Sequence, residues 1–238
     1  MTRLVLLSGW GIDQRIWQPI QPYWPDNVNA VTVDWPGYGK APALSANASI
    51  DELATVMAGR LPSDSVWVGW SLGGLLATAL LDYLPAPRGL VLLGAGTRFC
   101  VPGSALAAEL DDFRAVFTRR PDAAWRHFLR WQSQGEPAPQ QAYTQLRDLL
   151  GKTPGADHAT LATGLHWLAT LDNRQRLKVP PCPVVHLAGE HDPLTSRTTR
   201  QEALPIARCG HCPMLSQPAR LASLLAAQAA MLSAEEIV

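Results

Sequence analysis

The sequence predicts an α/β fold, with a mostly parallel sheet, helices on both faces and one helical insertion. Short apolar segments alternate with helical patterns over residues 4–93, and the alternation returns at residues 184–231. Strands that alternate with helices in this way indicate a parallel sheet that is covered on both faces. Residues 98–170 contain helical patterns and no convincing strand. We therefore expect a core made of residues 1–97 and 171–238, with residues 98–170 as a helical lid.

The expected strands are short apolar runs bounded by turn residues. They lie at residues 4–7, 28–33, 65–69, 89–93, 184–188 and 205–207. One expected helix starts at Ser49, because Ser49 and Glu52 form a capping box, and it runs to about Leu61. The other expected helices lie at residues 15–23, 72–81, 105–117, 123–134, 140–150, 158–169, 195–202 and 218–231.

Composition narrows the class of protein. Hydrophobic residues make up 47% of the 238 residues, which is enough for a well-filled core, and charged residues make up 17%. The formal net charge is zero, which argues against a general nucleic-acid-binding protein. The apolar run at residues 4–7 is shorter than a signal peptide requires, and no run approaches a membrane span. We expect a cytoplasmic protein that binds neither nucleic acid nor membrane.

One segment matches the G-x-S-x-G pattern of serine nucleophiles. It reads Gly69-Trp70-Ser71-Leu72-Gly73 and lies between an expected strand and an expected helix, the context that gives the pattern meaning. The glycines let the strand and helix pack closely, so a strained turn can lift the Ser71 hydroxyl above the sheet edge. The Leu72 N–H, at the start of the helix, can then stabilise an oxyanion. A tight turn with no chemistry is the alternative interpretation.

A second oxyanion donor is expected in the loop after the first strand. That loop reads Gly9-Trp10-Gly11, and the backbone N–H of Trp10 is the expected donor. Loss of one such donor typically costs about 2.7–4 kcal/mol of transition-state stabilisation. The alternative is that the glycines only form a tight turn.

His211 is the expected general base, and Asp192 is the acid expected to orient it. A serine hydroxyl is a weak nucleophile until a base takes its proton, and the chain order in this kind of site is serine, acid, histidine. Of the six histidines, only His211 lies between the last expected strand and the last helix. Asp192 follows the strand at residues 184–188, and Glu190 is the alternative acid. Either carboxylate would hold the imidazole in one tautomer.

The four cysteines are Cys100, Cys182, Cys209 and Cys212. In a cytoplasmic protein they are expected to be reduced thiols. Because Cys209 and Cys212 have C-x-x-C spacing around His211, a redox or metal role is an alternative. A zinc site would need further ligands, and the sequence holds no second pair of this kind. We expect no metal, and interpret the two cysteines as small residues beside a functional histidine.

At these residues the chain resembles the α/β-hydrolase superfamily, and more narrowly the pimeloyl-acyl-carrier-protein methyl ester esterases of biotin synthesis. The resemblance covers most of the chain. Its points of match are Leu4-Val5-Leu6-Leu7-x-Gly9-Trp10-Gly11, Gly69-Trp70-Ser71-Leu72-Gly73-Gly74, Phe128-Leu129-x-x-Gln132, Gly164-Leu165, Leu171-Asp172-x-Arg174, Gly210-His211 and Pro218. The tryptophans beside the serine and in the oxyanion loop are more specific than G-x-S-x-G alone.

The resemblance implies hydrolysis of the methyl ester of pimeloyl carried on acyl carrier protein, with release of methanol. It also implies a cytoplasmic monomer that needs no cofactor. The substrate contacts expected on this basis are Trp10, Ser71, Leu72, Phe128, Leu129, Arg130, Trp131, Gln132 and His211. The family often has a histidine at the position of Ser8, and the first expected strand starts at Leu4. We therefore expect altered packing in that loop, and leading strands that are absent or reduced relative to the full superfamily sheet.

The expected lid carries a local basic excess. Between Phe113 and Gly135 the only acid is Asp122, against the basic residues Arg114, Arg119, Arg120, Arg126 and Arg130. Acyl carrier proteins are acidic, so a partner should present a basic face. We expect contact with the carrier from Arg119, Arg120, Arg126 and Arg130. A solvated helix face is the alternative interpretation.

Other functions remain open at this point. The same parts would serve a general short-chain carboxylesterase or a thioesterase. A non-hydrolytic enzyme, such as a lyase of menaquinone synthesis with the same triad, is a second class, because fold does not fix function. A ligand sensor whose triad turns over slowly is a third.

Overall fold

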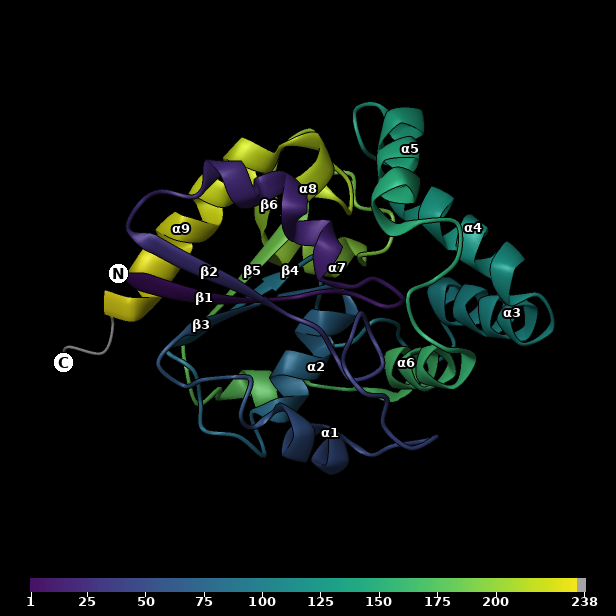
Figure 1. Cartoon of the computed structure of the whole chain (residues 1–238), viewed down its shortest axis with the longest axis horizontal. Coiled ribbons are helices and arrows are strands. Elements are labelled where there is room, and N and C mark those ends of the chain that lie inside the picture. The colour runs from purple at the N-terminus through teal and green to yellow at the C-terminus, as the bar shows by residue number, and fades with distance from the viewer. Residues whose placement is uncertain (235–238) are drawn as a thin grey trace.

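A computed structural model describes residues 1–234 of the chain. Within these residues six strands form one sheet in the order β2-β1-β3-β4-β5-β6, and all neighbouring strands are parallel (Figure 1). The strands are β1 (Thr2–Leu7), β2 (Val28–Val33), β3 (Val66–Trp70), β4 (Gly89–Leu93), β5 (Val184–Gly189) and β6 (Leu204–Ile206). The prediction of a mostly parallel sheet is confirmed. Parallel strands end at a common edge, so the loops that follow them meet there.

Helices cover both faces of the sheet. One face carries η1 (Gln14–Tyr23), α8 (Pro213–Ser216) and α9 (Pro218–Ala234), and the other carries α1 (Ile50–Met57), α2 (Leu72–Leu80) and η2 (Arg176–Lys178) (Figure 1). The short helix α7 (Arg197–Glu202) packs beside β5 and β6. This covering explains why β3 and β4 are buried over their whole length and read as continuous apolar runs.

Four helices follow β4 before the sheet resumes. They are α3 (Ala105–Arg119), α4 (Pro121–Ser133), α5 (Pro139–Leu150) and α6 (His158–Thr170). They pack on one another and lie together at one side of the sheet, where α6 also contacts α2 (Figure 1). Each of the helices expected between residues 98 and 170 is present, with bounds that shift by one or two residues.

Local departures from the sequence expectations have simple causes. Residues 14–23 form a 3-10 helix, because Pro19 and Pro22 supply no N–H for a regular α-helix. The capping box of Ser49 and Glu52 is confirmed, with the Ser49 N–H 2.8 Å from Glu52 Oε2. The helix that it starts ends at Met57, short of the expected Leu61, and a turn follows. The short helices η2 and α8 were not expected.

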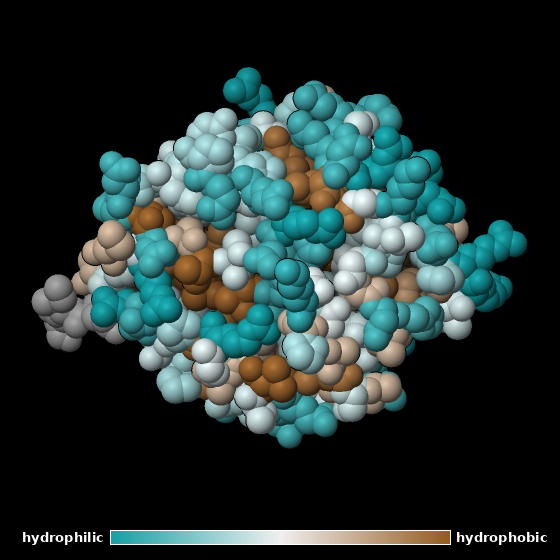
Figure 2. Space-filling model, in the orientation of Figure 1, coloured by the Kyte–Doolittle hydropathy of each residue, from teal (hydrophilic) through white to brown (hydrophobic). Residues whose placement is uncertain are grey.

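The core is rich in tryptophan. Trp17, Trp67 and Trp70 are each at most 1% exposed, and they pack with the leucines and valines of β1, β3 and β4. On the face shown in Figure 2, apolar side chains appear as separate patches among hydrophilic ones. Among residues 1–234, every helix is too short or too polar to cross a bilayer.

The crossing of β3 and α2 leaves no room for a side chain at Gly69. A Cβ added there would lie 2.5 Å from Gly74 Cα and 2.7 Å from the Gly73 carbonyl oxygen. We expect Gly69→Ala to lower the free energy of unfolding by at least about 1–3 kcal/mol, because both obstacles are backbone atoms. Urea unfolding measures the change. Gly59→Ala is the control, since a Cβ at Gly59 would meet nothing within 4 Å. Equal stability of the two variants would contradict this account of the crossing.

Candidate active site

Ser71 lies on a strained turn between β3 and α2. Its backbone has φ 55° and ψ −125°, a conformation that a residue with a side chain rarely adopts. The Ser71 N–H donates to the Leu93 carbonyl oxygen at 2.9 Å, which fixes the turn to the end of β4. Leu72 is the first residue of α2, so its N–H has no partner within the helix. This is the strand-turn-helix context that the G-x-S-x-G pattern required.

The loop after β1 packs directly against this turn. A Cβ at Gly9 would lie 3.0 Å from Ser71 Cβ. Two buried side chains hold the loop: Trp35 Nε1 donates to the Ser8 carbonyl oxygen at 2.9 Å, and Tyr38 Oη accepts from the Gly11 N–H at 3.1 Å. Among the described residues, the Trp10 N–H between them has no acceptor. The two residues expected to supply oxyanion donors are therefore Trp10, in the loop that packs against the Ser71 turn, and Leu72, at the start of α2.

Asp192 and His211 form a buried pair. His211 Nδ1 lies 2.8 Å from Asp192 Oδ2, and both side chains are at most 1% exposed. The carboxylate also accepts from Thr195 Oγ1 at 2.6 Å and from the Leu194 N–H at 2.8 Å. Burial by itself would raise the pKa of Asp192, but the charge of His211 and these three hydrogen bonds outweigh it, and the pKa is lowered. The carboxylate is therefore ionised and fixes the orientation of the ring.

Glu190, the alternative acid, is not in this position. Its side chain is half exposed, and its Oε2 accepts from the Arg208 N–H at 3.1 Å. The structure thus joins Asp192, rather than Glu190, to His211.

The other ring nitrogen of His211 is free. His211 Nε2 is buried and, among the described residues, has no hydrogen-bond partner. It therefore makes no hydrogen bond to Ser71 Oγ in this state, although Trp70, the residue before the serine, donates from Nε1 to the His211 carbonyl oxygen at 2.8 Å. The Trp70 and His211 rings are 5.2 Å apart. Bonds between a nucleophile and its base are often long before substrate binds.

The segment between α4 and α5 contacts the loops that carry Asp192 and His211, the expected acid and base. Glu136 is 4% exposed, and its Oε1 accepts from the Cys212 N–H at 2.6 Å. A Cβ at Gly135 would lie 2.0 Å from the His191 carbonyl oxygen, and one at Gly210 would lie 2.7 Å from the Gln134 carbonyl oxygen. The backbones are thus in direct contact. Sequence reasoning missed Glu136, because a lone acid after a helix carries no signal of the loop that it meets.

A sequence profile described as the alpha/beta hydrolase family matches residues 4–224. The chain belongs to the alpha/beta hydrolase family. It is 32% identical over 232 residues to the pimeloyl-[acyl-carrier protein] methyl ester esterase of Sodalis glossinidius, covering 90% of this chain and 88% of that protein. It is 34% identical over 239 residues to the biotin biosynthesis bifunctional protein BioHC of Cellvibrio japonicus, covering 94% of this chain and 47% of that protein.

Solved structures agree on the fold. MenH from S. aureus superposes with a TM-score of 0.74 at 20% identity, covering 97% of this chain and 94% of that one. The predictions of an α/β-hydrolase fold and of an enzyme of the carboxylesterase type are confirmed at the level of the family.

In this hydrolase, Ser8 stands at a position where a histidine was expected from the resemblance. Ser8 is fully buried, and among the described residues its Oγ has no hydrogen-bond partner. The loop is held instead through the Ser8 carbonyl oxygen, which accepts from Trp35. The replacement thus changes side-chain packing, while the backbone course of the loop is fixed by other groups.

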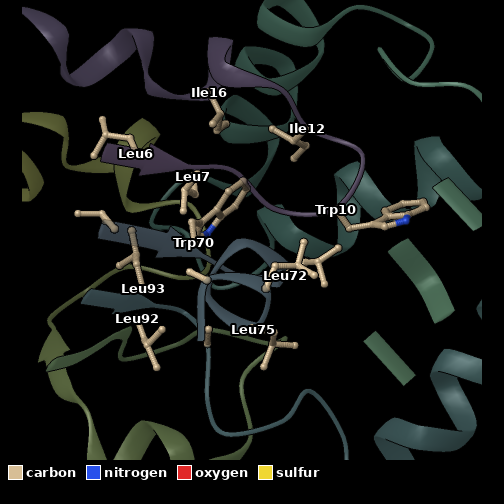
Figure 3. Close-up of a cluster of buried hydrophobic side chains, with 14 of the residues drawn as sticks. Leu6, Leu7, Trp10, Ile12, Ile16, Trp70, Leu72, Leu75, Leu92 and Leu93 are labelled. Carbon is tan, nitrogen blue, oxygen red and sulfur yellow. The ribbon is translucent and has the colours of Figure 1, made fainter. Parts of the chain in front are cut away.

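Of the expected substrate contacts on the helical segment of the hydrolase, Phe128 packs against Trp10. The indole Nε1 donates to the Leu161 carbonyl oxygen at 2.8 Å, and the Phe128 ring meets the indole edge-on, with the ring centres 4.9 Å apart. Figure 3 shows the Trp10 indole pointing away from Trp70 and Leu72. Further rings around it belong to Phe113, Phe117 and Trp125. Leu129 and Gln132 are buried, Trp131 is half-buried, and Arg130 is exposed with its guanidinium 5.3 Å from the Tyr143 ring centre.

The arginines expected to contact a carrier protein lie at the end of α3 and along α4. Arg119, Arg120, Arg126 and Arg130 are all exposed. Within residues 1–234 none of them forms an ion pair, and Arg119 Nε donates to the Ala115 carbonyl oxygen. Their charges are therefore presented to solvent.

The cysteines beside His211 are buried thiols. Burial raises the pKa of Cys209 to about 12 and that of Cys212 well above its ordinary value, with further contributions from Glu136 and Asp192. Thiols in such surroundings stay protonated and are poor nucleophiles. In the described part of the chain, no three His, Cys, Asp or Glu side chains are grouped so that they could hold a metal.

The Glu136 contact predicts an effect on the histidine loop. We expect Glu136→Ala to lower the free energy of unfolding by about 1–3 kcal/mol, because it leaves the buried Cys212 N–H without an acceptor. Glu136→Gln keeps an acceptor oxygen of the same shape and should lose less. Urea unfolding and turnover of a short ester measure the two variants. Equal losses in both would show that the buried charge, and not the hydrogen bond, is what matters.

The lowered pKa of Asp192 predicts a pH dependence of stability. Its ordinary value is about 3.9, so the ionised carboxylate stabilises the folded chain above that pH and loses this effect as pH falls through the lower folded value. The amide of Asp192→Asn cannot ionise. The free energy of unfolding of this variant should therefore fall less than that of the wild type between about pH 6 and about pH 3. Asp64→Asn, an exposed partner of Arg3, is the control. If the free energy of unfolding of Asp192→Asn fell with pH as steeply as that of the wild type, the lowered pKa of Asp192 would be refuted.

Proposed function

We propose that the chain is a serine esterase in which Ser71 is the nucleophile, His211 the general base and Asp192 the orienting acid. The observation that carries the proposal is the buried bond from His211 Nδ1 to Asp192 Oδ2, with Nε2 of the same ring left unpartnered. A ring held by its Nδ1 presents Nε2 as the acceptor of a hydroxyl proton. Ser71 follows β3 at the sheet edge where these loops meet, and Trp70 ties its turn to the His211 backbone.

The reaction then proceeds in two balanced stages. His211 Nε2 takes the Ser71 proton while Oγ attacks the ester carbonyl, and the oxyanion is held by the N–H groups of Trp10 and Leu72. The tetrahedral species collapses to an acyl-enzyme, and the imidazolium gives its proton to the departing alcohol. Water attacks the acyl-enzyme with His211 again as base, and this releases the acid and restores Ser71. Asp192 stays ionised throughout and stabilises the imidazolium.

For the substrate, we propose the methyl ester of pimeloyl bound to acyl carrier protein, with methanol as the alcohol released. The support is the name of the Sodalis relative, which matches along 90% of this chain. We further propose that residues 98–170 act as a lid. The acidic carrier would contact the exposed residues Arg119, Arg120, Arg126 and Arg130 of this lid. One chain supplies nucleophile, base and acid, so the proposed reaction needs no residue from a second chain and no cofactor. We also propose that the enzyme acts in the cytoplasm as a monomer.

The direct test is demethylation of methyl pimeloyl-acyl-carrier protein by the purified chain, followed by mass spectrometry of the carrier. We expect loss of the methyl group with the wild type, and none with Ser71→Ala. Rescue of biotin auxotrophy in cells that lack their own methyl ester esterase is the matching test in vivo. If folded protein hydrolyses a short ester through Ser71 but leaves the carrier ester intact, the biotin assignment fails and the esterase assignment stands.

Charge reversal tests the carrier contact. The double variant Arg126→Glu and Arg130→Glu should raise KM for the carrier-bound ester by about tenfold, because an attraction of about 1.4 kcal/mol is lost. Turnover of p-nitrophenyl butyrate should not change. Arg3→Glu is the control, because Arg3 lies on β1 and pairs with Asp64, far along the chain from the helical segment. An equal rise in KM for the double variant and for Arg3→Glu would argue against docking at α4.

A further inference from the structure

Two donors from the loop after β5 bond to different oxygens of the Asp192 carboxylate. The Leu194 N–H donates to Oδ1 at 2.8 Å, and the Thr195 hydroxyl donates to Oδ2 at 2.6 Å. His211 Nδ1 bonds to the same Oδ2 at 2.8 Å. An ionised carboxylate only accepts hydrogen bonds, so the proton of the threonine bond belongs to the hydroxyl. Thr195 and His211 therefore share one oxygen of the proposed acid.

The torsion that turns a carboxylate is soft. Rotation about the Cβ–Cγ bond of an aspartate has a broad, two-fold profile without sharp staggered minima. A donor on one oxygen restrains this rotation weakly, whereas donors on both oxygens fix the plane of the group. Since His211 is the ring to be oriented, the restraint on Oδ2 has to come from another group. Among the described residues, Thr195 is the only other donor to Oδ2.

Arg200, on α7, holds the backbone of the same loop. Its Nη1 donates to the Asp192 carbonyl oxygen at 2.6 Å and also to the Thr195 carbonyl oxygen. One guanidinium nitrogen thus bonds to both ends of the segment 192–195. The Thr195 hydroxyl therefore has a fixed place relative to the carboxylate that it contacts.

The space beside Asp192 and His211 admits no replacement for this hydroxyl. Thr195 is 6% exposed, and the Asp192 side chain is fully buried. A Cβ at Gly94 would lie 3.1 Å from both Asp192 Oδ2 and His211 Nδ1, so backbone closes that side. Ser71 and Thr195 line a common cavity of about 10 Å³, which is about the least that holds one water. A valine at position 195 would fill the volume of the threonine, and water could not restore the lost bond.

We propose that Thr195 is a positioning residue of this esterase, an inference that rests on the proposed function. Its hydroxyl fixes the plane of the Asp192 carboxylate, so that Oδ2 faces His211 Nδ1 while the ring takes up and returns the Ser71 proton. Without the hydroxyl the carboxylate can turn, and the ring is then less often oriented with Nε2 towards the serine. The effect falls on the chemical steps and not on the binding of the ester.

The test removes the hydroxyl and keeps the shape of the side chain. We expect Thr195→Val to lower kcat for p-nitrophenyl butyrate by about tenfold or more with little change in KM, because a small misplacement of a reacting group is costly. Thr195→Ser retains the hydroxyl and should retain most of kcat. Thr163→Val is the matched control, since Thr163 is 7% exposed and its hydroxyl bonds to the Ala159 carbonyl oxygen within α6. A kcat of Thr195→Val equal to that of the wild type would overturn the proposal.

A double variant separates positioning from a general loss of packing. Asp192→Ala leaves no carboxylate to orient, so addition of Thr195→Val should not lower its residual kcat any further. If the two losses in kcat multiply instead, Thr195 does not act through Asp192, and the proposal fails. Urea unfolding establishes that each variant is folded under the conditions of the assay.

Arg200 offers a second variant that leaves the Thr195 side chain in place. Arg200→Gln should lower kcat by several-fold, and Arg200→Lys by less, because an ammonium group can still donate to carbonyl oxygens. Arg197→Gln is the control, since Arg197 is exposed on the same helix. Equal kcat values for Arg200→Gln and Arg197→Gln would contradict the role given to Arg200.

The same assay distinguishes this inference from the proposed function. If the wild type hydrolyses no ester through Ser71, with Ser71→Ala as the reference, the proposed function itself fails. If the wild type is active and Thr195→Val is equally active, only the role of Thr195 fails.

Discussion

The close crossing of β3 and α2 is the constraint on which the site depends. Gly69 and Gly74 bring the two backbones into contact, and a Cβ at Gly73 would lie 2.5 Å from the Ser8 carbonyl oxygen. The chain can turn this sharply only if Ser71 takes a positive φ, at a cost of order 1–3 kcal/mol. Burial of the whole of α2 offsets this strain. The same crossing brings the loop after β1 against Ser71, so one packing constraint positions both the proposed nucleophile and its expected oxyanion donors.

The helical segment is attached to the core at two places around α5. Glu136 precedes the helix and accepts from the Cys212 N–H of the histidine loop. Arg15, on η1, donates to the carbonyl oxygens of Leu149 and Leu150 at the other end, and is itself held by Asp13. Such bonds satisfy carbonyls that a helix C-terminus leaves without partners. The histidine loop and the helical segment are therefore parts of one packed structure, although 76 residues separate Glu136 from Cys212.

Trp10 connects the loop beside Ser71 to the helical segment. Its backbone lies in the loop against Ser71, while its indole is surrounded by rings from α3 and α4 and is bonded to α6. A shift of these helices would therefore strain the loop that carries a proposed oxyanion donor.

The sequence by itself determined the parallel sheet, the position of the helical insertion and the turn at Ser71, because these depend on local periodicity and on glycine spacing. It also singled out Asp192, which follows a strand, and His211, which precedes the last helix. Only the tertiary structure decided which acid bonds to the histidine. Asp192 and Glu190 are two residues apart, and the direction of each side chain depends on the folded backbone. The contact of Glu136 with the histidine loop was equally beyond the sequence. It arises where segments distant along the chain pack together, and no local pattern encodes which distant surfaces will meet.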